Sequence, residues 1–399
     1  MGILYYLSYV ALLIGIILVL FVVIDNRQRE IKLKERKAKN FAILIPAKEE
    51  SKVIEELLKS IKKQIDDLSC TYVIAENEFD PTCKIVKSYG GKIYVRKNIG
   101  NKKRKGYALD EALKEILKKK KYDLYFIFDA DNILDKNYLN EMLKIYDKGY
   151  DIATGYRNIK NNINVITSCS GLTFSMINNL FNKINNKYKK TIIISGTGFF
   201  ISGKLVELWN GYPFHSLTED YELTLYATSN QIPTYYNDKA MFYDEQPTTM
   251  SVSIKQRTRW VKGFLEARKI RLNDLTTDLS KILGITPYLI LLGGAALFLV
   301  TSIIDTFTRM FYKVNFIDNI LNIIFLLVIV YFILLVFTII IYSNENKKLN
   351  ITNSLKIKSI FYNPIFLASY IICLIKALSK KDISWEKIEH TDNKIKNTN

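Results

Sequence analysis

The sequence predicts an α/β domain with a mostly parallel β-sheet, joined to α-helical transmembrane segments. Short β-rich runs alternate with amphipathic helical patterns between residues 41 and 244, and this alternation builds a parallel sheet covered by helices. Long uncharged apolar runs lie on both sides of that region. The chain of 399 residues has a formal net charge of +18, and its basic residues flank those runs. This distribution is typical of a membrane protein and argues against a purely soluble one.

The first apolar run, Ile3–Ile24, is uncharged and about as long as the ~20 residues that cross a bilayer. It lacks a basic n-region and a small-residue cleavage site, so residues 1–25 are interpreted as a retained anchor and not as a signal peptide. A stretch rich in Lys and Arg follows. The positive-inside rule then places the polar domain, residues 26–250, in the cytoplasm.

Strands are expected at 41–46, 71–75, 92–95 and 123–128, and helices at 51–65, 81–89, 105–118 and 136–146. Sheets of this kind bind ligands at the carboxyl ends of their strands, so functional residues should follow strands. The first strand is followed by IPAKEES and not by GxGxxG, which argues against a dinucleotide cofactor.

Two uncharged runs near the C-terminus, 282–304 and 320–342, predict a transmembrane hairpin within a membrane region at 282–378. A third segment, 360–378, is shorter, contains Pro364 and has lysines on both flanks. It is either an interfacial helix or a span, and both interpretations stay open. Residues 379–399 are expected to be a cytoplasmic tail, which makes the protein a multi-pass plasma-membrane protein.

Amino-acid counts exclude several chemistries. The two histidines, His215 and His390, are too few for histidine metal cages or Ser-His-Asp relays. The four cysteines lack paired spacing, which argues against a zinc site and against disulfides. Carboxylates must therefore carry any acid–base work.

Asp129 and Asp131 follow the fourth predicted strand and are separated by one residue. Two carboxylates at a strand end can converge on one hard divalent cation, which prefers oxygen ligands shared with substrate phosphates. A nucleotide diphosphate is the natural partner of such a site. The alternative is an ordinary capped turn leading to the next helix.

Thr218 is a predicted N-cap for a helix with Glu219, Asp220 and Glu222 in its first turn. Acidic residues are favoured there by the helix dipole, which is also the purely structural explanation. The preceding stretch contains Gly196 and other glycines that would let a sugar ring approach the backbone.

Residues 251–281 predict an amphipathic region that lies on an anionic membrane face. Within it, Arg257 and Arg259 have the forked donors that bind pyrophosphate, and Trp260 offers a flat surface for a sugar ring. Nucleic acid would use a similar mixture of residues, but the position beside a membrane span argues against it.

Five features follow one another along the chain: Pro46-Ala47, Asp80, Asp129/Asp131, Thr218-Glu219-Asp220 and Gln256–Trp260. Together they resemble the D, D-x-D, T/G-E-D and Q-x-x-R-W series of the membrane-bound family 2 glycosyltransferases. That group includes the cellulose, hyaluronan and poly-N-acetylglucosamine synthases. The resemblance implies a Rossmann-like GT-A fold, a UDP-sugar donor and a Mg²⁺ or Mn²⁺ ion at Asp129 and Asp131. It also implies that the C-terminal tail, with Trp385 and His390, gates the site from the cytoplasm.

The resemblance also implies a role for each matching residue. Contacts to the donor nucleotide fall on Pro46, Ala47, Glu49, Glu76, Asp80, Lys105, Gly106, Asp129, Ala130 and Asp131. Catalysis falls on Asp220 as general base, with Glu219 beside it. Contacts to the acceptor and diphosphate fall on Gln256, Arg257, Arg259 and Trp260. Many members have Asp where this chain has Glu76, so the resemblance implies that Glu76 recognises the uracil with an altered geometry.

The expected function is an inverting β-glycosyltransferase that extends a polysaccharide at the cytoplasmic face. The alternative is a single-transfer enzyme with a lipid-linked acceptor, and a third hypothesis is a noncatalytic sugar sensor. The predicted membrane region is small for a polymer channel, so a homo-oligomer or an accessory membrane protein is an expected partner beside the lipid bilayer. Nucleic acid is not an expected partner.

Overall fold

The computed structural model describes residues 33–97, 99–100, 102–271, 316–349 and 351–379, together with Val10, Ile304, Phe307 and Thr308. The predicted N-terminal anchor, the predicted span 282–304 and the predicted tail therefore lie almost wholly outside the described residues.

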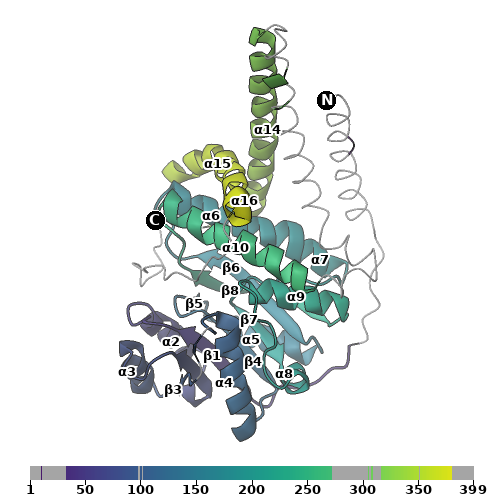
Figure 1. The fold of residues 1–399 in the computed structure, drawn as a ribbon. Coiled ribbons are helices and arrows are strands. Elements are labelled where there is room, and N and C mark those ends of the chain that lie inside the picture. The colour runs from purple at the N-terminus through teal and green to yellow at the C-terminus, as the bar shows by residue number, and fades with distance from the viewer. Residues whose placement is uncertain are drawn as a thin grey trace.

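An eight-stranded sheet forms the centre of the domain, in the order β3-β2-β1-β4-β7-β6-β8-β5 (Figure 1). The strands are β1 (Phe41–Ala47), β2 (Thr71–Ala75), β3 (Lys92–Val95), β4 (Leu124–Ile127), β5 (Ile133–Leu134), β6 (Ile152–Ile159), β7 (Phe199–Ser202) and β8 (Thr234–Asp244). All four strands predicted from the sequence form, within a residue or two of their expected bounds.

The sheet is mixed, whereas the sequence predicted a mostly parallel one. β1 pairs in parallel with β2 and β4, β2 with β3, and β6 with β8, but β7 is antiparallel to both β4 and β6, and β5 is antiparallel to β8. In the register, Phe199 pairs with Ile127, so β7 begins where β4 ends. The chain returns from β6 to the adjacent β7 at the same end of the sheet, without a crossover. β7 therefore runs in the direction opposite to β4 and β6.

Helices cover both faces of the sheet, as the βα pattern predicted. One core contains side chains of α2 (Ile54–Lys62), α3 (Pro81–Ser88) and α5 (Tyr138–Asp147). The other contains side chains of α4 (Lys105–Lys119), α8 (Gly203–Trp209) and α9 (Glu219–Ser229). In α4 the buried side chains recur at helical spacing, Leu109, Ala112, Leu113 and Ile116, which fixes the face that it packs on the sheet.

A second group of helices lies beyond one end of the sheet (Figure 1). α6 (Val165–Met176) continues through a π-helical stretch, Ile177–Lys183, into α7 (Ile184–Lys187). α10 (Met250–Ile270) runs beside α6 and α9, and α15 (Asn353–Ala368) and α16 (Tyr370–Ser379) lie over α6 and α10. α14 (Phe316–Glu345) projects away from the domain.

α14 contains the segment that the sequence predicted as a span at 320–342, and it is helical over 30 residues. Among the described residues, the stretch that is long and apolar enough to cross a membrane is Asn353–Ser379, with a shorter apolar helix at Val330–Glu345. The first of these bends at Ser369, between α15 and α16. The number of membrane crossings stays a prediction.

Candidate functional site

The D-x-D motif and the Thr-Glu-Asp motif lie side by side, joined by Lys105. Asp129 follows β4, and its backbone N–H donates to Oγ1 of Thr197 at 2.8 Å. Nζ of Lys105, the first residue of α4, forms an ion pair with Asp129 and donates to the carbonyl of Gly196 at 2.7 Å. One ammonium therefore connects β4, α4 and the loop before β7.

Lys105 and the carboxylates of the two acidic motifs act on one another electrostatically. Burial by itself lowers the pKa of Lys105, but the carboxylates of Asp129 and Glu219 outweigh burial and raise it. Burial and repulsion from Asp220 raise the pKa of Glu219, although Lys105 lowers it. Burial also raises the pKa of Asp220, against the lowering effect of Lys105, Arg157 and Arg259. This acidic pair has the elevated pKa values that proton-transferring groups need.

Two glycines permit this close arrangement. A Cβ on Gly106 would lie 1.9 Å from the carbonyl oxygen of Phe214, so α4 reaches the segment before α9 only because residue 106 has no side chain. Gly196 has φ +81°, and a Cβ there would lie 3.4 Å from Oδ2 of Asp220. Gly106, predicted as a nucleotide contact, therefore has a packing role in this fold.

Asp131 lies deeper than Asp129 and is held by the segment after β8. The backbone N–H of Glu245 donates to Oδ2 of Asp131 at 3.1 Å, and Nδ2 of Asn132 donates to Oδ1 at 3.2 Å. Lys160 donates to the Asp131 carbonyl at 3.0 Å. Ala130, between the two aspartates, is buried in the same turn.

Asp244, at the end of β8, is a carboxylate that the sequence analysis did not single out. Its Oδ2 accepts from Nε of Arg157 at 2.8 Å and from Nε2 of Gln246 at 2.7 Å. Within the part of the chain that the structure describes, no donor reaches Oδ1. Burial raises the pKa of Asp244 and the charge of Asp131 raises it further, whereas Arg157 lowers it. Asp131 and Asp244 are therefore electrostatic neighbours.

These carboxylates fit a divalent cation that is shared with a bound ligand. The described residues contain no group of three or more His, Cys, Asp or Glu close enough to enclose an ion by themselves. The Asp129 side chain is 40% exposed, and Asp244 has an oxygen without a donor. Mg²⁺ typically takes only one or two protein carboxylates and completes its shell with phosphate and water oxygens.

An aromatic contact links this acidic cluster to α10. The Arg157 guanidinium lies 3.9 Å from the ring centroid of Phe174 in α6. The same ring also contacts Trp260, at a centroid distance of 6.0 Å and an interplanar angle of 70°. Arg157 also donates to the carbonyl of Ser195 at 2.6 Å. Trp260 is thus connected through one ring to the residue that holds Asp244.

α10 approaches the start of α9 through Gly263. A Cβ on Gly263 would lie 2.6 Å from Cγ2 and 2.8 Å from the backbone N of Thr218. Arg259, one turn earlier on the same helix face, lowers the pKa of Asp220. The sequence motif Gln256–Trp260 is therefore anchored to the Thr-Glu-Asp motif by a glycine that the sequence analysis did not identify.

Replacing Gly263 with alanine is expected to destabilise the protein by about 1–3 kcal/mol, because the added methyl group must push α10 away from Thr218. Denaturant unfolding of the detergent-solubilised protein measures this loss. Ala267→Gly, one turn later on the same face, would remove a methyl group instead and serves as a comparison. A Gly263→Ala variant as stable as the wild type would contradict the close approach.

Arg257 does not lie at the site, which corrects its prediction as a diphosphate contact. Its side chain is buried, and Nη1 donates to the carbonyl of Phe366 in α15 at 3.0 Å. Residues two apart on a helix point about 200° apart, so Arg257 and Arg259 face opposite sides of α10. Gln256 is partly exposed on the same helix.

The predicted nucleotide contacts near β1 and β2 divide into two groups. Pro46 and Ala47 end β1 beside the end of β2, and Glu76 pairs with Lys48 at 2.6 Å and lies 4.0 Å from Arg96. Asp80 is buried, and both its oxygens accept from backbone amides, those of Glu49 and Thr82. Asp80 therefore caps α3 and holds the loop of Glu49 in place.

Residues 38–263, over half of the chain, match the family described as "Glycosyltransferase like family 2". A curated relative, "Probable glycosyltransferase YdaM" of Bacillus subtilis, is 26% identical over 228 residues, which are 56% of this chain and 54% of the relative. The chain thus spans about half the length of that relative. The solved structure of the mannosyltransferase PcManGT from Pyrobaculum calidifontis, in complex with GDP-Man and Mn²⁺, is similar with a TM-score of 0.59. It is 13% identical, and the match covers 95% of this chain and 100% of that one.

That structural likeness confirms the predicted α/β Rossmann-like GT-A fold. The chain belongs to glycosyltransferase family 2.

Proposed function

We propose that the protein is a membrane-bound inverting glycosyltransferase that takes its sugar from a UDP-sugar. The observation that supports this most is the cluster in which Lys105 bridges Asp129 and the loop beside Asp220. This cluster brings Asp129, a carboxylate suited to a diphosphate and its cation, close to Glu219 and Asp220, whose pKa values are raised. Family membership supports the same reaction class.

In this proposal Asp220 is the general base. It takes the proton from the acceptor hydroxyl as that oxygen attacks the anomeric carbon in line with the departing diphosphate. Lys105, Arg157 and Arg259 favour its charged form because they are nearby cations, and its charge in turn raises the pKa of Glu219. The Gly196 turn leaves room beside the carboxylate for the acceptor.

Asp129 and Asp131 would hold Mg²⁺ or Mn²⁺ together with the donor diphosphate, and Asp244 is a further candidate ligand. When bound, the cation neutralises the charge that develops on the departing UDP. Arg157 positions Asp244, and Lys105 adds a positive charge beside Asp129. The uracil of the donor would be surrounded by Pro46, Ala47, Glu49 and Glu76. Asp80 would hold their loop in shape.

Gln256, Arg259 and Trp260 would contact the acceptor sugar and the diphosphate. We favour a growing cell-surface polysaccharide as the acceptor, with the catalytic domain on the cytoplasmic side of the plasma membrane and a homo-oligomer or accessory membrane protein completing the channel. The alternative is a lipid-linked acceptor such as a polyprenyl phosphate or diacylglycerol, with which the exposed apolar side chains of α14 and α15 are compatible.

The test is incubation of the purified, detergent-solubilised protein with Mn²⁺ and a panel of radiolabelled UDP-sugars, with GDP-mannose as a further donor. UDP release from one donor together with a high-molecular-weight product supports polysaccharide synthesis. Label that enters only the lipid extract supports the lipid acceptor. Absence of nucleotide release from every donor, in lipid as well as detergent, would contradict the proposal.

The acid limb of the pH–rate profile is expected to move upward when Lys105 is replaced with methionine. The ammonium lowers the pKa values of Glu219 and Asp220, so its removal raises them. Because the base acts only when deprotonated, activity is then lost at a higher pH as the solution is acidified. The measurement is kcat/KM against pH for the wild type, Lys105→Met and the exposed control Lys103→Met. A limb that moves downward or stays in place in Lys105→Met would contradict the assignment.

A further inference from the structure

The two helices α15 and α16 form a bent unit, residues 353–379, that is here called the elbow. Its inner side is buried on the catalytic domain, through Ser359, Asn363, Phe366, Cys373 and Ala377. α15 packs on α6 and α14, and α16 packs along α10. Nδ2 of Asn363 donates to Oγ1 of Thr338 in α14 at 2.9 Å, which places a polar contact on this inner side.

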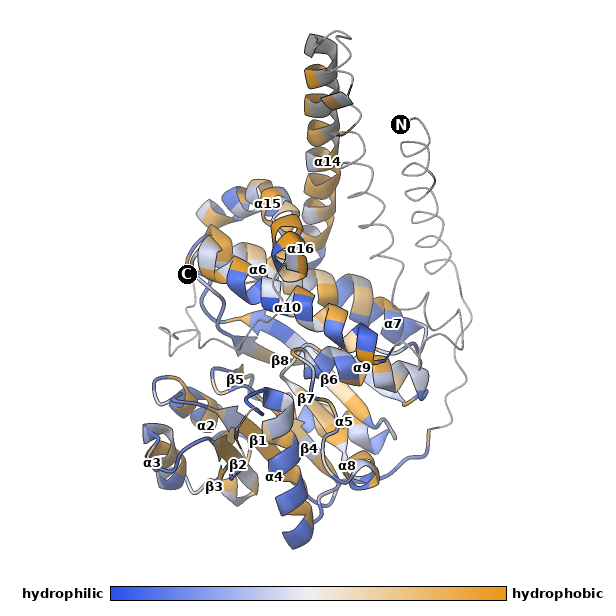
Figure 2. Ribbon diagram, viewed as in Figure 1, coloured by the Kyte–Doolittle hydropathy of each residue, from blue (hydrophilic) through white to orange (hydrophobic). Residues whose placement is uncertain are grey.

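Figure 2 shows α16 as mostly hydrophobic and α15 as a mixture of hydrophobic and hydrophilic residues. The exposed apolar side chains of the elbow, 38–66% accessible, are Ile357, Phe361, Ile365, Ile371, Ile372, Leu374, Ile375 and Leu378. Lys356, Lys358 and Lys376 lie among them. An apolar surface of this extent bordered by lysines is typical of an interaction site, and its charge favours an anionic partner.

α14 indicates what covers this surface. Large apolar side chains of α14 are exposed from Ile320 to Ile340 on several sides, as expected for a helix surrounded by lipid. In its last turns Ile341, Tyr342 and Glu345 are buried against the domain. The lipid surface must therefore lie near these last turns, and Figure 1 shows the elbow at the same level, beside the base of α14.

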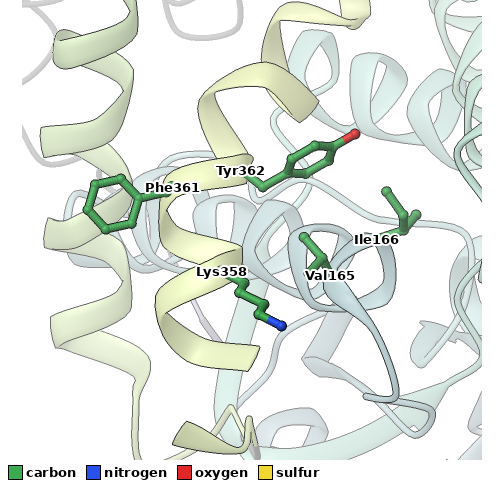
Figure 3. Close-up of a pocket in the computed structure, with 5 residues that line it drawn as sticks. All are labelled: Val165, Ile166, Lys358, Phe361 and Tyr362. Atoms are coloured by element: carbon green, nitrogen blue, oxygen red, sulfur yellow. The ribbon is translucent and has the colours of Figure 1, made fainter. Parts of the chain in front are cut away.

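A hollow of about 370 Å³ opens between the elbow and α6. It is lined by Val165, Ile166, Lys358, Phe361 and Tyr362. Figure 3 shows Lys358 and Tyr362 extending from α15 on the side of Val165 and Ile166, whereas Phe361 points away. Apolar walls with one ammonium suit a phospholipid, because its acyl chain can contact the apolar walls and its anionic headgroup can pair with the ammonium.

Arg257 fastens the elbow to α10. Its Nη1 donates at 3.0 Å to the carbonyl of Phe366, in the last turn of α15, where helix carbonyls lack intrahelical partners. The guanidinium lies 4.0 Å from the ring centroid of Phe366 and 4.8 Å from that of Tyr370. Nζ of Lys262 donates to the carbonyl of Ala377 at 3.1 Å. Arg257 is three residues before Trp260 on α10.

We propose that the elbow lies flat in the headgroup region of an anionic bilayer leaflet, and that Arg257 transmits its position to α10 and so to Trp260. Arg257 is a positioning residue in this arrangement. Because both helices of the elbow are buried on one side against the domain, the chain stays at the surface and does not cross. The inference rests on the membrane association of the proposed function, but not on the transfer reaction.

Depth-dependent quenching tests the flat placement. The full chain, with Cys70→Ser because the other three cysteines are buried, receives one NBD probe at Ile357→Cys, Ile365→Cys or Ile375→Cys. Probes at Leu327→Cys in α14 and at Leu208→Cys, 72% exposed on α8, are the controls. Each protein is placed in phosphatidylglycerol-containing nanodiscs with spin labels at the headgroup or at the chain end.

All three elbow probes are expected to be quenched more by the headgroup label than by the chain-end label, and the Leu208 probe by neither. A probe at Ile365 that is quenched most by the chain-end label would show a crossing and overturn the proposal. Unquenched elbow probes with a quenched Leu327 probe would also overturn it, while leaving membrane association intact. Quenching at none of these positions would contradict membrane association itself.

Hydrogen exchange tests the role of Arg257. In the wild type, anionic nanodiscs are expected to slow amide exchange in both the elbow and α10 relative to phosphatidylcholine nanodiscs. In Arg257→Met the slowing should persist in the elbow and be lost in α10, and Arg257→Lys should restore part of it. Equal slowing of α10 in the wild type and in Arg257→Met would overturn the coupling. If Arg257→Met does not fold, the comparison of wild type with Arg257→Lys carries the same test.

Discussion

Asp220→Asn is expected to reduce sugar transfer by about 10²–10⁴-fold, the usual contribution of a general base. The amide has nearly the same shape as the carboxylate but cannot take up the proton of the acceptor hydroxyl. Binding of UDP should stay close to that of the wild type, because Asp129 and Asp131 are unchanged. Turnover and the UDP dissociation constant, measured on the same preparation, check both parts of the prediction.

Two matched variants sharpen this experiment. Glu219→Gln removes the neighbouring buried carboxylate. Because repulsion between Glu219 and Asp220 raises their pKa values, this variant should shift the pH profile more than the maximal rate. Glu207→Gln removes an acidic group from the distant helix α8 and should behave as the wild type. Unchanged turnover in Asp220→Asn would end its assignment as the base.

Asp131→Asn is expected to weaken the metal-dependent binding of UDP by at least about tenfold, the smallest usual effect of disturbing a metal site. The substitution removes one of the charges that attract the cation while leaving a side chain that can accept from the Glu245 amide. Calorimetric titration of UDP with and without Mn²⁺ measures the effect. Binding without Mn²⁺ should change little.

Asp244→Asn separates two roles for the third carboxylate. If its Oδ1 contacts the cation, the variant should lose Mn²⁺-dependent affinity as Asp131→Asn does, whereas a purely structural role with Arg157 would lower stability alone. Asp135→Asn, four residues after Asp131 and only partly buried, is the control. Full Mn²⁺ dependence in Asp131→Asn would contradict the metal assignment.

The path of the chain through the first half of the domain was predictable from the sequence. Strands such as 71–75 and helices such as 105–119 formed where β-rich runs and helical spacing indicated them, because periodicity reports which face of an element is buried. The same pattern placed Asp129 and Asp131 at a strand end and Asp220 at a helix start. Those local positions are fixed by backbone conformation alone.

The partners of those residues were not predictable in the same way. Lys105 meets Asp129 across 24 residues and Arg157 meets Asp244 across 87, and neither pair has a local sequence pattern. The one available signal was that Asp244 ends a strand, as Asp129 follows one. The antiparallel placement of β7 was equally hidden, because strand patterns carry no direction.

The sequence by itself determined the α/β class, the order of the acidic and basic motifs and the long apolar segments, since composition and periodicity depend only on neighbours along the chain. Only the tertiary structure decided which of these residues face one another. Arg257 and Arg259 look equivalent in the sequence, yet the rotation of α10 turns one toward α15 and the other toward Asp220. Helix phase is set by packing, here by Gly263 against Thr218, and packing is a property of the whole fold.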